Sequence, residues 1–190
     1  MDITIRPVSP DDAEELLGIY SYYVTDTAVS FEHDVPTADE FRARIENTLE
    51  KYPYLAALDE GRIVGYAYAG TFIPRAAYSR CAELSVYIHR DFRRRGLGRM
   101  LYAELESLLG KMGILNLYAC IAIPSANEDE FLTNASIDFH EHIGFVRVGM
   151  FRSCGYKFGR WYDMVWAEKL IGGHTADPAP VIAYKDIRDA

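Results

Sequence analysis

Three consecutive arginines and two closely spaced glycines are the residues of this sequence best suited to chemistry. They form the run Arg93-Arg94-Arg95-Gly96-Leu97-Gly98, and a helical pattern follows it directly. The first N–H groups of a helix have no partner within the helix, and the helix dipole places partial positive charge at that end. Glycine lets the backbone approach a ligand closely, and guanidinium groups add charge. The run therefore predicts a site for a phosphorylated ligand.

The elements on either side should hold this turn in place. Downstream, leucines recur at three- and four-residue spacing, so one face of a helix from Leu97 to Leu109 is expected to be buried. Upstream, Leu84, Val86 and Ile88 alternate with less apolar neighbours, which is typical of a strand with two distinct faces. The predicted ligand site thus lies where a strand ends and a helix begins.

Two common phosphate-binding patterns do not fit this turn. The P-loop needs four residues between its glycines and then Gly-Lys-Ser/Thr, which the sequence lacks. The dinucleotide fingerprint needs a third glycine, and residues 96–101 read Gly-Leu-Gly-Arg-Met-Leu. The sequence therefore disfavours a nucleoside-triphosphate site and a dinucleotide site.

The turn resembles the acetyl-coenzyme A site of the GNAT N-acetyltransferases, whose signature is Gln/Arg-x-x-Gly-x-Gly/Ala between a strand and a helix. Arg93, Gly96 and Gly98 match this signature. From about residue 3 to residue 168, the order and spacing of further motifs resemble the phosphinothricin acetyltransferase branch of that family. These motifs are Ala67-Tyr68-Ala69-Gly70, Arg75 with Tyr78, Glu83 to Tyr87, Gly96-Leu97-Gly98, Leu101-Tyr102, His140-Glu141, and Gly155-Tyr156-Lys157 with Trp161 and Asp163.

The order of the expected elements predicts an α/β fold. Two capping boxes, at residues 9–12 and 37–40, should open helices that run to about residues 23 and 51. A short helix is expected at 134–142, and strands at 3–6, 54–58, 62–71, 82–88, 115–123, 145–152 and 160–168. We expect one GNAT-type domain, residues 1–170, with a mixed, mainly antiparallel sheet of about seven strands and helices on both faces. Glycine, proline and aspartate then become frequent, so residues 171–190 are expected to form a tail.

The resemblance implies an enzyme. Its members move an acetyl group from acetyl-coenzyme A to the primary amine of a small amino-acid-like substrate, such as phosphinothricin, methionine sulfoximine or methionine sulfone. The amine attacks directly in a ternary complex. Two alternatives remain, namely acetylation of protein or peptide N-termini and a non-catalytic coenzyme A-binding module. The presence of Glu83 and His140 disfavours the second alternative.

Two residues are candidates for the general base that an amine needs, since an amine is mostly protonated near neutral pH. Glu83 precedes the coenzyme segment of its strand and matches the glutamate that has this role in the branch. His140 matches the family histidine of His-Glu-x-x-Gly-Phe/Tyr, and its ordinary pKa suits proton transfer. A surface ion pair for Glu83 and a structural role for His140 are the alternatives.

The resemblance also implies which residues contact the coenzyme. The strand backbone at Val86, Tyr87 and Ile88 should follow the pantetheine arm, where an N–H group could bind the thioester oxygen. The pyrophosphate is expected on the turn and its arginines. Asn134 matches an asparagine beside pantetheine, although asparagine is also a common helix N-cap. The expected contacts outside the strand are Arg93, Arg94, Arg95, Gly96, Leu97, Gly98, Arg99, Asn134 and Ser136.

Phe31, Arg75 and Tyr78 match positions near the amino-acid substrate of the branch. Arg75 would suit a carboxylate or phosphinate, because a planar guanidinium binds two oxygens at once. An exposed loop arginine is the alternative. The segment 124–133 is longer and more acidic than in the antibiotic-resistance members, so it either reshapes the acceptor entrance or extends the surface.

Composition excludes several other classes. The 190 residues are 49% hydrophobic, which is enough for one core, and a net charge of −8 argues against nucleic-acid binding. Cys81, Cys120 and Cys154 follow no metal-ligand pattern, so free thiols and no metal are expected. No leader or membrane-spanning stretch is evident, which favours a cytoplasmic protein without membrane contact. The resemblance implies a homodimer.

Overall fold

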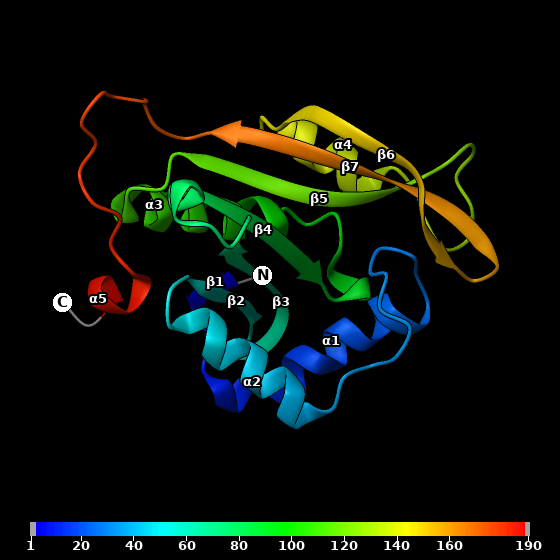
Figure 1. The fold of residues 1–190 in the computed structure, drawn as a ribbon. Helices are drawn as coiled ribbons and strands as arrows, with labels where there is room; N and C mark the ends of the chain where they lie inside the picture. The colour runs from blue at the N-terminus through cyan, green and yellow to red at the C-terminus, as the bar shows by residue number, and fades with distance from the viewer. Residues whose placement is uncertain (1–2, 189–190) are drawn as a thin grey trace. The chain divides into compact units, whose positions relative to one another are not determined.

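The computed structural model describes residues 3–188, which form two compact units (Figure 1). The first unit comprises the residues up to Ile19, Pro36–Leu117 and the residues from Leu170 onward. The second unit comprises Tyr20–Val35 and Tyr118–Lys169. The described residues contain seven strands, as expected from the sequence.

The first unit is built on four strands. They are β1 (Ile3–Pro7), β2 (Tyr54–Asp59), β3 (Arg62–Thr71) and β4 (Cys81–Ile88). Neighbours in this order pair antiparallel, and the last pairing sets Gly70 of β3 opposite Glu83 of β4. Glu60 and Gly61 have positive φ angles of 51° and 84° in the tight turn between β2 and β3, where glycine is favoured. The sheet thereby fixes the strand that leads to the arginine-rich turn.

Both predicted capping boxes are confirmed. Ser9 and Asp12 bond reciprocally around a short 3₁₀ turn that precedes α1 (Ala13–Thr25). Thr37 and Glu40 do the same at the start of α2 (Ala38–Leu49). Each pair satisfies N–H groups that a helix start would otherwise leave without partners.

Helix α3 (Leu97–Met112) follows the arginine-rich turn and packs on β2, β3 and β4. It extends three residues beyond the expected end at Leu109, because Gly113, with a φ of 85°, forms the left-handed C-cap. Its buried face contains Leu97, Leu101, Tyr102, Leu105, Leu109 and Met112. The predicted amphipathic pattern is thus confirmed, and it anchors the start of the helix.

The segment that follows residue 170 packs on the first unit and ends in a short helix, α5 (Tyr184–Arg188) (Figure 1). The Arg80 guanidinium donates to the carbonyl oxygens of Pro178, at 3.2 Å, and Ala179, at 2.7 Å. The Tyr184 side chain is buried. Arg80 and the buried Tyr184 thus fasten the predicted tail to the first unit.

The second unit contains three strands and a helix. These are β5 (Asn116–Pro124), whose first two residues belong to the first unit, α4 (Ala135–His142), β6 (Val146–Lys157) and β7 (Arg160–Leu170). The strand order is β5-β7-β6, and β6 pairs antiparallel with β7. Four buried residues, Ala28, Ala122, Leu132 and Tyr162, form a hydrophobic cluster in this unit.

Strand β6 continues beyond the expected end at Arg152. The residues that follow form an irregularity in the strand, where the register shifts between Phe151 and Gly155. Ser153 has a φ of 48° there, and its N–H donates to Asp163 Oδ1 at 2.7 Å. Because Asp163 lies on the neighbouring strand, only the tertiary pairing could reveal this bulge.

Three further findings concern the composition-based expectations. None of Cys81, Cys120 and Cys154 is in a disulfide bond, as predicted. Within residues 3–188, no group of three or more His, Cys, Asp or Glu side chains is placed to hold a metal ion. None of the helices formed by these residues has the length and apolar character needed to cross a membrane.

Candidate active site

The arginine-rich turn in the first unit presents backbone N–H groups at the start of α3. Gly96 is the N-cap residue and has a φ of 80°, and it offers no side chain that could cap the first turn. The first intrahelical bond of α3 runs from the Met100 N–H to the Gly96 carbonyl oxygen, at 3.1 Å. Arg94 also has a positive φ, 60°, which costs about 1 kcal/mol or more for a residue other than glycine. Strain of this kind is common at binding sites.

Exposed guanidinium groups surround this turn. The side chains of Arg93, Arg94, Arg95 and Arg99 are all exposed. The Arg95 guanidinium lies 4.8 Å from the centroid of the Phe92 ring, within the range of a cation–π contact. Positive charge and N–H groups at a helix start together suit an anionic oxygen such as that of a phosphate or pyrophosphate.

The strand that leads to this turn is fixed by its pairing with β3. Val86 lies opposite Ala67, and Ile88 lies opposite Gly65, where an added Cβ would collide with the Ile88 side chain. Beyond the strand, the His89 N–H donates to the Val64 carbonyl oxygen at 2.9 Å. The backbone from residue 86 to residue 88 is therefore held firmly up to the point where the chain turns toward α3.

Glu83 lies on the same strand, three residues before Val86. Glu83 is partly buried, and the residue paired with it on β3, Gly70, bears no side chain. Burial raises the pKa of Glu83, because desolvation disfavours the carboxylate. A carboxylate with a raised pKa is a stronger base, which favours proton acceptance near neutral pH.

Tyr102 of α3 is a residue near Glu83 to which the sequence assigned no role. Its side chain is fully buried, and burial raises its pKa, with further contributions from Tyr68, Glu106 and Glu83. The tyrosine is therefore neutral, and it lies close enough to Glu83 for the carboxylate charge to contribute to the rise of its pKa. The motif Leu101-Tyr102 was the available signal, but tyrosine on a buried helix face is ordinarily explained by packing.

Arg75 and Tyr78 lie in the connection between β3 and β4. Both are exposed, and the Tyr78 ring makes an edge contact with Phe72 at a centroid distance of 5.9 Å. Within residues 3–188, the Arg75 side chain makes no hydrogen bond or ion pair. A guanidinium in this state can pair with a carboxylate of a ligand without first breaking an internal bond.

His140 lies in the second unit and is only 3% exposed. Its Nδ1 donates to the Ser136 carbonyl oxygen at 2.7 Å, and its ring makes edge contacts with Phe139 and Phe145. Burial lowers the pKa of His140 to about 4. The ring is therefore neutral at pH 7 and a weak base, an environment that favours a structural role.

Asn134 occupies the N-cap position of α4, but the expected side-chain cap is not formed. Its Nδ2 donates to Glu128 Oε1 at 3.3 Å, and its backbone N–H donates to the same oxygen at 2.8 Å. The neighbouring Thr133 side chain accepts from the Ala135 N–H instead. Asn134 therefore donates to Glu128 of the acidic segment through both its backbone and its side chain.

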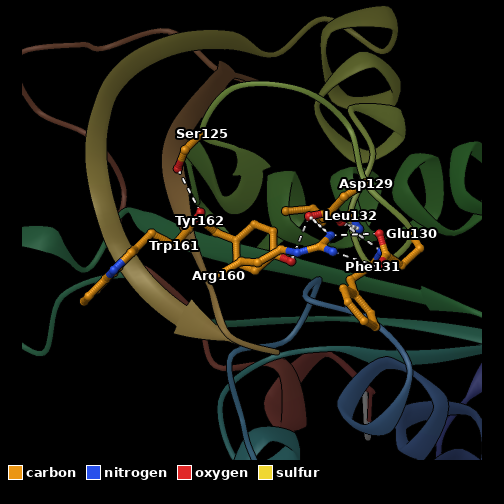
Figure 2. Close-up of polar contacts among 8 residues, drawn as sticks. All are labelled: Ser125, Asp129, Glu130, Phe131, Leu132, Arg160, Trp161 and Tyr162. Carbon is orange, nitrogen blue, oxygen red and sulfur yellow. Dashed lines mark hydrogen bonds and ion pairs between the residues drawn. The ribbon is translucent and has the colours of Figure 1, made fainter.

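The acidic segment 124–133 is internally bonded (Figure 2). Asp129 accepts from the N–H groups of Phe131 and Leu132, at 2.9 and 2.8 Å. Arg160 pairs with Asp129, at 2.9 Å, and with Glu130, at 2.8 Å, and its guanidinium lies 5.2 Å from the Phe131 ring centroid. Burial raises the pKa of Asp129, but the bonds from Arg160 and the two N–H groups outweigh it and lower the pKa. These acidic groups therefore fix the segment to the β6–β7 turn.

Phe31 is partly buried against the hydrophobic cluster of the second unit. Its ring lies 6.4 Å from that of Tyr162. On another side it contacts Gly155 so closely that a Cβ at that position would overlap the ring. The position of Phe31 is therefore set by strand β6.

The predicted site residues are divided between the two units. The first unit contains Glu83, Val86, Tyr87, Ile88, the residues 93–99, Arg75 and Tyr78, which lie on β4, at the start of α3 and in the β3–β4 connection. The second unit contains Phe31, Asn134, Ser136 and His140. Glu83, Val86, Tyr87 and Ile88 lie on β4, and Ser136 and His140 lie on α4, whereas Phe31 and Arg75 lie in connections.

Known proteins are similar to nearly the whole chain. A model of the acetyltransferase (GNAT) domain matches residues 5–166. The phosphinothricin N-acetyltransferase of Alcaligenes faecalis is 37% identical over 181 residues, covering 92% of this chain and 86% of that protein. The L-methionine sulfoximine/L-methionine sulfone acetyltransferase of Pseudomonas paraeruginosa is 33% identical over 174 residues, covering 88% of this chain and 94% of that protein. The crystal structure of a GNAT superfamily phosphinothricin acetyltransferase from Sinorhizobium meliloti, in complex with AcCoA, has a TM-score of 0.84 and 30% identity, and covers 97% of this chain and 99% of that chain.

Proposed function

This chain belongs to the GNAT family of acetyltransferases, and we propose that it acetylates the primary amine of a small amino-acid-like acceptor, of the phosphinothricin or methionine sulfoximine type. It is an N-acetyltransferase that uses acetyl-coenzyme A. The predicted α/β fold is that of the family. The observation that carries the proposal is the strand–turn–helix of the first unit, where Glu83 lies on the strand that leads to the glycine turn.

The residues of the turn are suited to the diphosphate of coenzyme A. The N–H groups at the start of α3 and the exposed arginines supply hydrogen-bond donors and positive charge. The backbone of Val86, Tyr87 and Ile88 would follow the pantetheine arm. One of its N–H groups would donate to the thioester oxygen as negative charge develops there. Asn134 and Ser136 complete the proposed contacts.

Glu83 is the proposed general base. It takes a proton from the ammonium group of the acceptor, directly or through a water molecule, and the free amine then attacks the carbonyl carbon of the thioester. A C–N bond forms, the C–S bond breaks and the nitrogen gives up its second proton, while the leaving thiolate takes up one proton, so that the products are the amide and free coenzyme A. The raised pKa of Glu83 supports this assignment, whereas the low pKa and the burial of His140 support a structural role for the histidine.

The acceptor would be held by three side chains. Arg75 is exposed in the β3–β4 connection and suits the carboxylate of an amino acid. Tyr78 and Phe31 would provide aromatic walls. The two relatives named above act on molecules that combine an amino acid with a phosphinate, sulfoximine or sulfone group. We infer the same class of acceptor here.

A homodimer is also proposed. Val146, Val148 and Met150 alternate along β6, an edge strand, and are 57%, 51% and 48% exposed. A long edge strand with exposed apolar side chains is suited to burial against a second copy. A sedimentation experiment that finds a monomer at micromolar concentration would contradict this.

We further propose a cytoplasmic protein without a metal, nucleic-acid or membrane partner, which the cysteines outside any disulfide bond and the net charge of −8 support.

The test is release of free thiol from acetyl-coenzyme A in the presence of individual acceptors, with the products identified by mass spectrometry. The panel contains phosphinothricin, methionine sulfoximine, methionine sulfone, common amino acids and short peptides. We expect acetylation of the first three compounds. Acetylation of peptides alone would favour N-terminal acetylation of proteins, and coenzyme binding without turnover would favour the non-catalytic alternative.

A further inference from the structure

Lys157, at the end of β6, is a buried lysine that the proposed reaction does not use. It is 3% exposed. Its ammonium group donates to the carbonyl oxygens of Thr27, at 2.9 Å, and Ser30, at 2.6 Å, and lies 5.1 Å from the centroid of the Phe158 ring. Burial lowers the pKa of Lys157, and the charge of Glu32 opposes that effect. Lysine is seldom buried without compensating bonds, so these contacts account for its position.

The two carbonyl groups belong to the segment 27–31, which leads to Phe31. Other polar groups of this segment are also bonded within the second unit. The Ala28 N–H donates to the Phe131 carbonyl oxygen at 3.0 Å, and the Ser30 hydroxyl bonds the Tyr20 hydroxyl at 2.8 Å. Lys157 therefore adds two bonds to a set that ties the segment 27–31 to the rest of the second unit.

Strand β6 contacts this segment through a second residue. Gly155 and Lys157 are separated by one residue, so they lie on the same face of the strand, and both are buried while Tyr156 between them is exposed. Gly155 leaves the space that the Phe31 ring occupies. The same strand face thus receives the ring and bonds the backbone that precedes it.

We propose that Lys157 is a positioning residue for the amine acceptor, because it fixes the Thr27 and Ser30 carbonyl groups and thereby the Phe31 ring. The inference deepens the proposed function and rests on it, since it takes Phe31 as a wall of the acceptor site. Loss of the ammonium group would leave two buried carbonyl groups without this donor and would release Phe31 from its position. Affinity for the acceptor would then fall, while binding of acetyl-coenzyme A, which involves other residues, would not.

The experiment compares KM for the acceptor with KM for acetyl-coenzyme A. Lys157→Met removes the donor and keeps a long apolar side chain. We expect its acceptor KM to rise about tenfold or more, because small misplacements of positioning residues have effects of this size. The KM for acetyl-coenzyme A should stay within about twofold of the wild-type value, a change too small to count as a lost contact. Lys157→Arg retains charge and donors and should show a smaller rise. Arg147→Met is the matched control: Arg147 lies on the same strand as Lys157, and its replacement breaks an exposed ion pair with Glu141 of α4.

The double variant Lys157→Met with Phe31→Ala separates this inference from the proposed function. If Lys157 acts through Phe31, its replacement should no longer change the acceptor KM once the ring is absent. A persistent effect, or equal rises of both KM values in the single variant, would overturn the inference. If Phe31→Ala alone leaves the acceptor KM unchanged, the assignment of Phe31 to the acceptor site is wrong instead.

Gly155→Ala tests the same relationship if Lys157→Met fails to fold. The added methyl group would meet the Phe31 ring while the bonds of Lys157 stay in place. We expect a higher acceptor KM with an unchanged KM for acetyl-coenzyme A. An unchanged acceptor KM in this folded variant would show that β6 does not position the acceptor through Phe31.

Discussion

The Nδ1 of His140 donates its hydrogen to the Ser136 carbonyl oxygen, 2.7 Å away, within helix α4. The imidazole is thereby fixed in a buried position, and burial lowers its pKa from 6.5 to about 4. Below pH 6.5 the unfolded chain binds a proton at this residue, whereas the folded chain does not do so until about pH 4. The free energy of unfolding should therefore decrease as pH falls through this window, by at most about 3 kcal/mol.

His140→Phe tests this dependence. Its free energy of unfolding, measured in urea between pH 4 and pH 7, should decrease less toward acid than that of the wild type. At pH 7 the folded variant should retain most of its turnover, because the histidine is not the proposed base. A loss of turnover of about 100-fold in a folded variant would show that His140 takes part in proton transfer.

Glu83→Gln should lower turnover by about 100-fold or more, as expected for a lost general base. It should also stabilise the protein at neutral pH. The pKa of Glu83 is raised in the folded state, so the folded chain binds this proton more tightly than the unfolded chain does. The contribution of Glu83 to the free energy of unfolding is therefore lost as pH rises through the folded-state pKa. Glutamine removes that effect. Activity and Tm at pH 7 are the measurements, with Glu106→Gln as the control, and unchanged activity would exclude Glu83 from the mechanism.

Arg75→Ala should raise the KM for an acidic amino-acid acceptor by about 10- to 100-fold, the usual size of a lost charge-assisted hydrogen bond. The KM for acetyl-coenzyme A should stay constant. Steady-state kinetics with each substrate varied in turn provide both values. Equal changes in the two constants would mean that Arg75 does not bind the acceptor carboxylate.

Gly96→Ala should weaken coenzyme binding and destabilise the fold by about 1 kcal/mol, because an alanine adopts a φ of 80° only with strain. Arg94→Gly provides the contrast. It relieves the positive φ of 60° and should raise Tm, while the loss of charge should raise the KM for acetyl-coenzyme A. Calorimetry and steady-state kinetics measure these effects. An Arg94→Gly variant with wild-type coenzyme KM would remove this arginine from the proposed contacts.

Arg160→Met should release the segment 124–133, since the guanidinium binds Asp129 and Glu130 and covers the Phe131 ring (Figure 2). Hydrogen exchange of the Phe131 and Leu132 amides should become faster, and limited proteolysis should cut in this segment first. Arg42→Met, which breaks an exposed ion pair with Asp11, should not change either result. Protection equal to the wild type would show that the Asp129 bonds to the backbone suffice.

Local sequence rules predicted the parts of the protein that depend on near neighbours. The capping boxes at Ser9 and Thr37 involve residues only three positions apart, and the glycine turn before α3 depends on backbone freedom at Gly96 and on the following leucine spacing. These patterns, together with the family resemblance, gave the number of strands and the position of the turn. The end of α3 was placed three residues early, at Leu109, whereas the left-handed Gly113 marks its observed end.

The tertiary structure decided what depends on residues distant in the chain. The bulge at Ser153 needs Asp163 from the neighbouring strand, and the segment after residue 170 is held by Arg80, far earlier in the chain. The pKa shifts of Glu83 and His140 also could not be predicted from the sequence, because a pKa shift depends on burial and on the groups packed around the side chain. Residue types and spacing therefore determined the family and the candidate site, and long-range packing decided which of the candidate bases retains a useful pKa.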